Sequence, residues 1–356
     1  MTAPRLRFEH ETLPQRVVFA PGEASAKLAD EIGRLGAGRV MVIAGRHGAG
    51  LAEQVTGGLP VALRHHEVVM HVPVEVAERA REAAADHEVD VLVTVGGGST
   101  TGLAKAVALT LGLPIVAVPT TYAGSEATNV WGLTEGGTKT TGVDDRVLPR
   151  AVVYDATLTT SLPVELSVAS GLNALAHSID AMWAPRANPI NQTLAGEAIR
   201  ALAVGLPLVV DDPLGLPGRE QSLYGAYLAA LSFALAGSAL HHKICHVLGG
   251  RHDLPHAQTH AIVLPHVLAF NQPNAPEAAE RIASAFGAST ALEGLLRLQS
   301  ELGAPRALKD HGFAETDIPG AARAILPQVP ASNPTSVTLE GLEVLLHAAW
   351  AGADPR

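Results

Sequence analysis

The segment VDVLVTVGGGSTTGLAKAV, residues 89–107, decides the fold. An apolar run ends at three consecutive glycines and continues as a helical pattern. A buried strand that turns through glycine into a helix is typical of a parallel sheet covered by helices. Similar apolar runs occupy residues 39–45, 113–121 and 151–155, with helical stretches at 74–87 and 101–111. The sequence therefore predicts a Rossmann-like α/β domain with a doubly wound parallel sheet, which binds ligands at the carboxyl ends of its strands.

The pattern changes after about residue 160. Long Ala/Leu-rich helical stretches follow, separated by loops at residues 211–220 and 251–256. A chain of 356 residues is also longer than one core usually grows. We expect an α/β dinucleotide-binding domain over residues 1–155 and an all-helical domain over 156–356, with the active site in the cleft between them.

Composition limits the classes of partner. The chain is 47% hydrophobic, and its 25 basic and 35 acidic residues give a net charge of −10, which argues against nucleic acid or an acidic membrane. The single cysteine, Cys245, excludes an intrachain disulfide and fits a reducing cytoplasm. Residues 1–16 lack the apolar core of a signal peptide. The uncharged run at 223–240 is long enough to span a membrane, but its Ala, Gly and Ser content favours a helix buried in the helical domain.

The glycine cluster predicts a phosphate site. Gly96, Gly97 and Gly98 allow a phosphate to approach the backbone, and Ser99 begins a helix whose free amides attract anions. A tight turn without a ligand is the alternative. The hydroxyls of PTTYAGSE, residues 119–126, end a neighbouring strand and favour binding. Arg46 follows the first glycine-ended run and could meet a 2′-phosphate or lie free on the surface, so the choice between NADH and NADPH stays open.

Histidines supply the second signal. Residues 241–260 hold six of the chain's 16 histidines, and His266 follows. Asn173 and His177 lie four residues apart on one helix face, and His242 and His246 repeat that spacing at the end of the apolar helix. His256 follows a Gly-Gly loop and a proline that could return it towards them. Two histidines on one helix face with ligands elsewhere can hold a divalent ion, although hydrogen-bonded core histidines give the same pattern. Because Asn173 is a neutral amide, tightly bound Fe²⁺ or Zn²⁺ is not expected.

Six blocks together resemble the maleylacetate reductases, a branch of the iron-containing (group III) alcohol dehydrogenase-like superfamily. They are GGGSTTGLAK, PTTYAGSE, WGLTEGGTKTTG, VLPRAVVYD, SGLNALAH and HHKICHVLGG…DLPHAQTHAIVLPHVLAFN. The resemblance spans essentially the whole chain. It implies a dehydroquinate synthase-like fold, a homodimer, and NADH- or NADPH-dependent reduction of the carbon–carbon double bond of maleylacetate to 3-oxoadipate in the degradation of aromatic compounds.

The resemblance also assigns residues. The superfamily's four metal ligands fall on Asn173, His177, His242 and His256, with Asn in place of Asp, as is usual in this branch, whose members can work without bound metal. Its further histidine near the nicotinamide falls on His246. Its cofactor contacts fall on Gly97, Gly98, Ser99, Thr120, Thr121, Ser125 and Lys139.

The chemistry of the reaction suggests roles. Hydride addition beside a conjugated ketone builds negative charge on the ketone oxygen, so an oxyanion donor and a proton donor are needed. We expect these from the predicted catalytic residues His177, His242, His246, His256 and Tyr122. The small dicarboxylate substrate would be bound by His241, Lys243, Arg251 and Asn173, each of which could equally be a surface or packing residue.

The chain departs from the branch at Ala127, Asn129, His252 and Gln258, which puts the exact substrate in question. A metal-dependent alcohol dehydrogenase for a small alcohol or aldehyde is one alternative, which Asn173 disfavours. A lyase or cyclase on the same scaffold is another, and a nucleotide-binding protein without catalysis is a third, which the histidine cluster disfavours.

Overall fold

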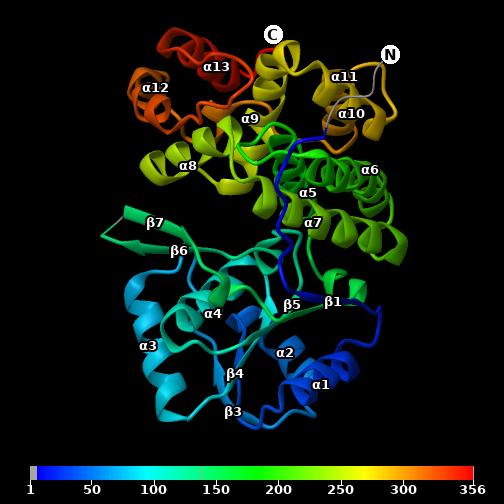
Figure 1. Cartoon of the computed structure of the whole chain (residues 1–356), viewed down its shortest axis with the longest axis vertical. Coiled ribbons are helices and arrows are strands. Elements are labelled where there is room, and N and C mark those ends of the chain that lie inside the picture. The colour runs from blue at the N-terminus through cyan, green and yellow to red at the C-terminus, as the bar shows by residue number, and fades with distance from the viewer. Residues whose placement is uncertain (1–5, 137, 356) are drawn as a thin grey trace. The chain divides into compact units, whose positions relative to one another are not determined.

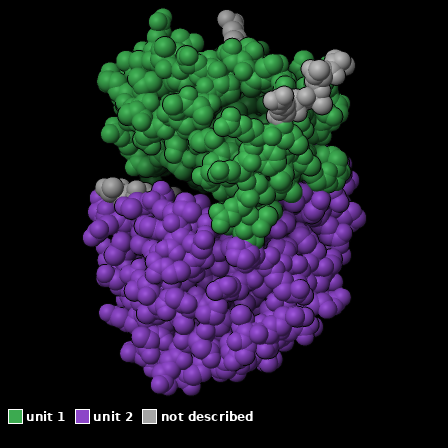
Figure 2. All heavy atoms as spheres, viewed as in Figure 1, with its two compact units in different colours: residues 1–13, 175–200, 231–356 green, residues 14–174, 201–230 purple. Residues whose placement is uncertain are grey.

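The computed structural model describes residues 6–136 and 138–355, with the side chains of residues 138 and 139 excepted. The chain forms two compact units (Figure 2). Residues 14–174 and 201–230 make up one, here called the sheet unit. Residues 1–13, 175–200 and 231–356 make up the other, the helical unit. The domain boundary expected at residue 155 remains a prediction.

Six parallel strands form the sheet of the sheet unit, in the order β1-β8-β5-β4-β2-β3. Their bounds are β1 (Arg16–Phe19), β2 (Val40–Ile43), β3 (Val61–His65), β4 (Val91–Gly96), β5 (Ile115–Pro119) and β8 (Ala151–Tyr154). The chain runs from β2 to β3 on one side and then returns to β4 on the other. This reversal between β2 and β4 is the topological switch point at which doubly wound sheets bind ligands.

Helices cover both faces of this sheet (Figure 1). In β2, Val40 and Val42 pack with α1 (Ala24–Leu35) and α2 (Ala49–Thr56). The alternate residues, Met41 and Ile43, pack with α3 (Val74–Asp86) and α4 (Gly98–Leu111). A strand buried on both faces reads as a continuous apolar run, which is why β2, β4, β5 and β8 were predictable.

Some strands were not predicted from the sequence. β1 carries an arginine, and β3 is only half-buried along its length, so neither forms a fully apolar run. A separate antiparallel hairpin, β6 (Val130–Glu135) and β7 (Thr138–Val143), also went unpredicted because its residues are polar and glycine-rich.

The later part of the chain is helical, as expected, and strands no longer alternate with helices after β8 in the described residues. Its helices are α5 (Val164–Ala181), α6 (Pro189–Asp211), α7 (Leu216–Ala236), α8 (Leu240–His252), α9 (His256–Asn271), α10 (Pro276–Phe286), α11 (Ala291–Glu301), α12 (Ile318–Ile325) and α13 (Leu339–Ala351). Short 3-10 helices are η1 (Arg46–Gly48), η2 (Ser125–Ala127), η3 (Asp145–Val147), η4 (Ala156–Thr159), η5 (Gln272–Asn274), η6 (Leu308–His311), η7 (Glu315–Asp317) and η8 (Leu326–Gln328). Leucines and isoleucines of α8, α9, α12 and α13 form the core of the helical unit.

Two local expectations in this region were wrong. The apolar run at 223–240 is not one helix, because α7 ends at Ala236 and Gly237 adopts a φ of 90° before α8 starts at Leu240, with the two helices bent by 99°. His242 and His246 therefore lie on a new helix. The Gly-Gly pair before His256 is not a loop either, since α8 continues to His252 and reverses at Asp253, whose φ is 51°.

Long apolar helices raise the question of membrane insertion. By length and composition alone, α6 would be able to cross a membrane, as would α7 and α8 if the bent pair were one span. The apolar window of α6 is 44% buried inside the protein. Apolar helices of this kind also form the cores of large helical proteins, so the property is weak evidence for a membrane span.

A buried lysine ties α4 to the hairpin. Lys105 Nζ donates to Thr128 O at 2.7 Å, Thr128 Oγ1 at 3.0 Å and Val130 O at 2.8 Å. Burial lowers the pKa of Lys105 from 10.5 to about 7, an effect that the charge of Glu126 opposes. Three oxygen acceptors satisfy an ammonium group and fix the segment that leads into β6.

We expect Lys105→Met to destabilise the protein by about 2–4 kcal/mol, because buried carbonyls would lose their donor. The free energy of unfolding in urea measures this. Lys27→Met is the matched control, since Lys27 is only half-buried and forms a surface ion pair with Glu23 at 3.2 Å, and about 0.5 kcal/mol or less is expected there. Equal stability of the two variants would contradict a structural role for Lys105.

Candidate active site

The glycine loop lies at the switch point of the sheet. β4 ends at Gly96, α4 starts at Gly98, and β5 ends at Pro119, directly opposite Gly96. Thr120 N donates to Gly96 O at 3.1 Å, so the loops after β4 and β5 are bonded to each other. The segments predicted to bind phosphate and nicotinamide therefore meet at one edge.

Two of the glycines are required by internal packing. Gly96 has a φ of 154°, and a Cβ there would lie 2.5 Å from Thr100 Oγ1. A Cβ on Gly97 would lie 2.9 Å from Thr121 Cγ2. The Thr121 hydroxyl is buried and has no hydrogen-bond partner among the described residues. A tight turn explains the glycines, whereas the unpaired hydroxyl favours a polar ligand.

The remaining predicted cofactor residues occupy the same strand ends, except Lys139. Arg46 is exposed at the start of η1, just after β2. Ser125 starts η2, after β5. Lys139 lies in β7 opposite Thr134, and its side chain falls outside the described ones.

The histidine cluster belongs to the helical unit. His177 of α5 and His242 of α8 stack with ring centroids 5.1 Å apart, and Phe233 packs against both rings. His246 lies 6.0 Å from His242, measured between ring centroids. His256, the first residue of α9, contacts His260 at 4.3 Å. The predicted histidines thus come together, although His246 and His256 are exposed and His177 and His242 are not.

Asp180, one turn after His177 on α5, orients His242. Its carboxylate accepts from His242 Nδ1 at 2.7 Å, from Ala239 N at 2.8 Å and from His241 N at 3.3 Å. Burial raises the pKa of Asp180, but three donors hold it as a carboxylate. His242 therefore carries its proton on Nδ1 and turns Nε2 away from Asp180.

Several buried polar atoms of the cluster lack partners among the described residues. In the helical unit they are His177 Nδ1, His242 Nε2, His241 Nδ1 and His260 Nε2, and in the sheet unit Asn173 Oδ1 likewise has none. Buried groups of this kind usually pair with water, an ion or a ligand. His177 and His242 match two of the superfamily's metal ligands, and their imidazole nitrogens are suitable ligands for a metal. Asn173, which matches a third, is a neutral amide, and Asp180 lies behind His242, so neither supplies an anionic ligand.

Burial also keeps the imidazoles neutral. Desolvation lowers the pKa of His177 to about 4, and lowers the pKa values of His241, His242 and His260 well below the usual range. Each of these rings then has one N–H donor and one acceptor nitrogen at neutral pH.

The residues predicted to bind the substrate differ in how deeply they are buried. Lys243 is half-buried on α8, and its charge contributes to the lowered pKa of His242. Arg251 is exposed near the end of α8. His241 is buried and shares a hydrogen bond of 2.9 Å with His260. Tyr122 is fully buried, and its hydroxyl accepts a hydrogen bond from the buried Arg219 at 3.2 Å. Tyr122 and His241 are thus each bonded to another residue of the protein.

Asp180, His260 and Cys245 were missed in the sequence. His260 lies four residues after His256, and Asp180 three after His177, so the helical spacing already used for the predicted histidines would have found both. Cys245 lies four after His241. Ligand atoms of His241, Cys245 and His260 all lie within 4.8 Å of one another.

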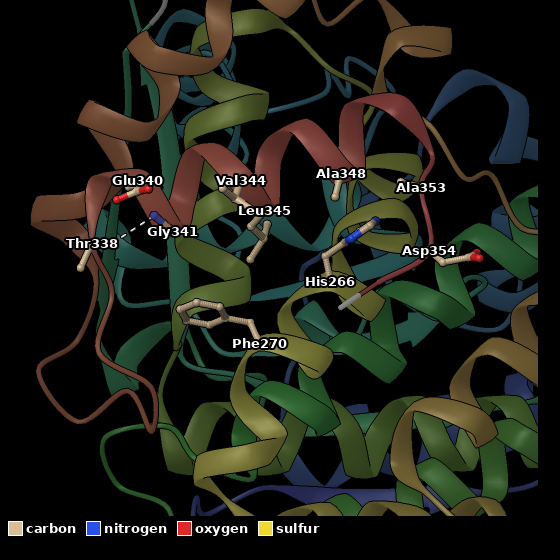
Figure 3. Close-up of a pocket in the computed structure, with 10 residues that line it drawn as sticks. All are labelled: His266, Phe270, Thr338, Glu340, Gly341, Val344, Leu345, Ala348, Ala353 and Asp354. Atoms are coloured by element: carbon tan, nitrogen blue, oxygen red, sulfur yellow. Dashed lines mark hydrogen bonds between the residues drawn. The ribbon is translucent and has the colours of Figure 1, made fainter.

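A separate pocket of about 630 Å³ lies between α9 and α13 (Figure 3). His266 and Phe270 face Val344 and Leu345 across it, and its lining includes none of the predicted site residues. His266, the seventh histidine of its stretch, thus lines a different cavity from the cluster.

Comparison with known proteins identifies the family. Residues 14–156 match the model described as iron-containing alcohol dehydrogenase, and residues 167–350 match the C-terminal part of the Fe-containing alcohol dehydrogenase family. The chain belongs to the iron-containing alcohol dehydrogenase family. Its fold, with a parallel α/β part followed by a helical part, is the fold of this family, as expected. The protein is an oxidoreductase of a family that uses NAD(P).

Relatives narrow the branch. The maleylacetate reductase of Sphingobium indicum is 46% identical over 98% of this chain and 99% of its own. The structure of maleylacetate reductase from Agrobacterium tumefaciens has a TM-score of 0.94 and 41% identity, covering 99% of this chain and all of that one. An iron-containing alcohol dehydrogenase structure from Corynebacterium glutamicum has a TM-score of 0.98 and 61% identity, covering 99% of both chains. The resemblance to maleylacetate reductases is confirmed.

We expect Gly97→Ala to destabilise this family member by about 1–3 kcal/mol, because the new methyl overlaps Thr121. The thermal unfolding midpoint measures the loss. Gly98→Ala is the matched control, because its Cβ would meet only Ala123 Cβ at 3.4 Å. Thr121→Ala in the Gly97→Ala background should restore much of the stability. Identical midpoints for the two single variants would rule out the contact.

Proposed function

We propose that this enzyme reduces the carbon–carbon double bond of maleylacetate with NADH or NADPH and forms 3-oxoadipate. Full-length similarity to maleylacetate reductases carries the proposal. The cluster of buried neutral imidazoles around Asp180 supports it, because the reaction needs donors for a developing oxyanion. We further propose that the cofactor loops of the sheet unit and the histidines of the helical unit serve one active site.

The cofactor would be held by the loops after β2, β4 and β5. Gly96, Gly97, Gly98 and Ser99 offer backbone amides at the start of α4 to the pyrophosphate. Thr120, Thr121 and Ser125 would lie beside the nicotinamide, with Lys139 near the cofactor, and Arg46 would meet a 2′-phosphate if NADPH is used. When bound, the cofactor supplies the hydride that adds to the carbon β to the ketone.

Negative charge then develops on the ketone oxygen. We assign His177 to stabilise it, because a neutral imidazole donates one N–H without first gaining a proton. His242 is assigned to relay a proton to the α-carbon. Its Nε2, which carries no proton at rest, would take one from the exposed His246 or His256 and pass it on. Asp180 holds its Nδ1–H and stabilises the protonated ring, as a carboxylate does for the histidine of a hydrolase triad. The exposed His246 and His256 would return the proton from solvent.

Charge also governs binding of the substrate, which is a dianion. Lys243 and Arg251 of α8 would pair with its carboxylates. Asn173, being neutral, leaves the site less negative than an aspartate would, so it repels a dianion less. Tyr122, whose hydroxyl accepts from Arg219, and His241, whose Nε2 is bonded to His260, would act by position.

A metal on Asn173, His177, His242 and His256 would act as a Lewis acid towards the ketone oxygen when bound. Because this ligand set has no carboxylate, we propose that catalysis does not require tightly held Fe²⁺ or Zn²⁺. We also propose a homodimer in the cytoplasm, which the family resemblance and the single cysteine support.

The decisive assay follows NADH and NADPH oxidation with maleylacetate, in parallel with small aldehydes. We expect turnover with maleylacetate. With aldehydes kcat/KM should be at least about 100-fold lower, because polar groups of the enzyme that bind the carboxylates of maleylacetate would be left without partners. Chelation should leave the rate unchanged, with elemental analysis as its check. Aldehyde turnover without maleylacetate turnover would favour an alcohol dehydrogenase, the activity named for the Corynebacterium relative.

Asp180→Asn should lower kcat by about 10–100-fold with little change in KM, because a positioning residue of this kind sets the tautomer of His242. Nitrogen-15 NMR of the histidines should show the His242 proton leaving Nδ1, a change that general loss of stability would not produce. Asp180→Glu should recover part of the rate.

Asp317→Asn is the matched control, because it removes a half-buried Asp–His pair outside the cluster, with His252 at 3.5 Å. Its kcat should match the unmodified protein. An unchanged His242 tautomer in Asp180→Asn would refute the role of Asp180.

A further inference from the structure

We propose that His241, Cys245 and His260 form a second, inhibitory site for a thiophilic divalent cation such as Zn²⁺ or Cd²⁺. The site shares no residue with the set formed by Asn173, His177, His242 and His256. His241 and Cys245 lie one turn apart on α8, and His260 faces them from α9, which packs against α8 (Figure 1).

Two of the three distances between ligand atoms are close to those of a zinc site, and the third, from Cys245 to His260, is within 4.8 Å. Cys245 Sγ lies 3.6 Å from His241 Nε2, against roughly 3.5 Å between sulfur and nitrogen ligands of tetrahedral zinc. His241 Nε2 and His260 Nδ1 are 2.9 Å apart, shorter than the roughly 3.3 Å of two zinc-bound nitrogens. The rings need to separate by a few tenths of an ångström, which loss of their shared hydrogen bond permits.

The donor types select the cation. Two imidazoles and one thiolate suit Zn²⁺ and softer ions, and exclude Mg²⁺ and Ca²⁺, which prefer oxygen. The thiolate also supplies an anionic ligand, which the set around Asn173 lacks. A thiophilic metal should therefore prefer Cys245, leaving a fourth position for water.

Metal binding displaces the protons on the ligand atoms, and each of them can be accounted for. Without metal the thiol is protonated, since burial raises the pKa of Cys245 well above its usual value. Binding releases this one proton to solvent. One imidazole moves its proton to the far nitrogen, either His241 Nδ1 or His260 Nε2, neither of which has a partner among the described residues. Affinity should therefore rise about tenfold per pH unit below the thiol pKa.

The proposed metal site lies behind the exposed ring of His256. His256 is exposed and contacts His260 with ring centroids 4.3 Å apart, so a cation can enter beside it. Once bound, the metal lies beside His242, whose ring centroid is 5.2 Å from His241 and 5.1 Å from His260. Metal binding separates the His241 and His260 rings, both of which pack against His242, and we expect the resulting shift of the His242 ring to inhibit the proposed reaction.

Co²⁺ is the probe, because cobalt thiolates absorb in the near ultraviolet. One equivalent of Co²⁺ added to the metal-free protein should give a thiolate charge-transfer band that Zn²⁺ abolishes by competition. The band should vanish in Cys245→Ser and persist in His177→Ala, the matched control for the other ligand set. Cys245→Ala replaces the serine variant if circular dichroism shows that it is misfolded.

Absence of the band in the unmodified protein, its persistence in Cys245→Ser, or its loss in His177→Ala would each overturn the site. These readouts do not depend on the substrate, so they stand apart from the proposed function. With any substrate that is turned over, Zn²⁺ loading should lower the rate at least about tenfold in the unmodified protein and not in Cys245→Ser. Equal rates with and without Zn²⁺ would overturn inhibition.

Discussion

The buried carboxylate of Asp180 fixes both the start of α8 and the orientation of its first functional side chain. Two of its three donors are backbone amides at residues 239 and 241, and the third is the His242 ring. The break after α7 makes this arrangement possible, because a continuous helix would use those amides within itself. The kink at Gly237 thus frees the amides that bind Asp180, and the same carboxylate sets the orientation of His242.

The same carboxylate changes how Asn173 should be understood. A metal-binding relative is expected to place a carboxylate on the metal, whereas here the negative charge lies behind a histidine. In the proposed mechanism this carboxylate stabilises the His242 ring while it carries a second proton, from the side away from Nε2. The amide at 173 and the acid at 180 together support the proposal of proton transfer without tight metal binding.

The sheet could be predicted from the sequence, because four of its strands are buried on both faces and end in glycine or polar turns. β3 and the hairpin were missed, because their side chains are half-buried or polar and the pattern fades there. A single helix was predicted across α7 and α8, because the apolar composition continues through the break and only Gly237 marks the bend. The histidines of the site were predictable from helical spacing. Their separation into buried and exposed members depends on packing across helices, which spacing alone does not describe.

The contact between Gly97 and Thr121 links two loops that belong to different strands. Position 97 cannot accept a side chain while position 121 is threonine, so the two positions are coupled. Relatives with a side chain at position 97 should carry a smaller residue than threonine at 121, and the change at 121 must arise first or together with the change at 97. The loop after β2, where Arg46 is exposed, is free of this constraint. If Arg46 meets the 2′-phosphate as proposed, cofactor preference can change at that position while the glycine turn stays fixed.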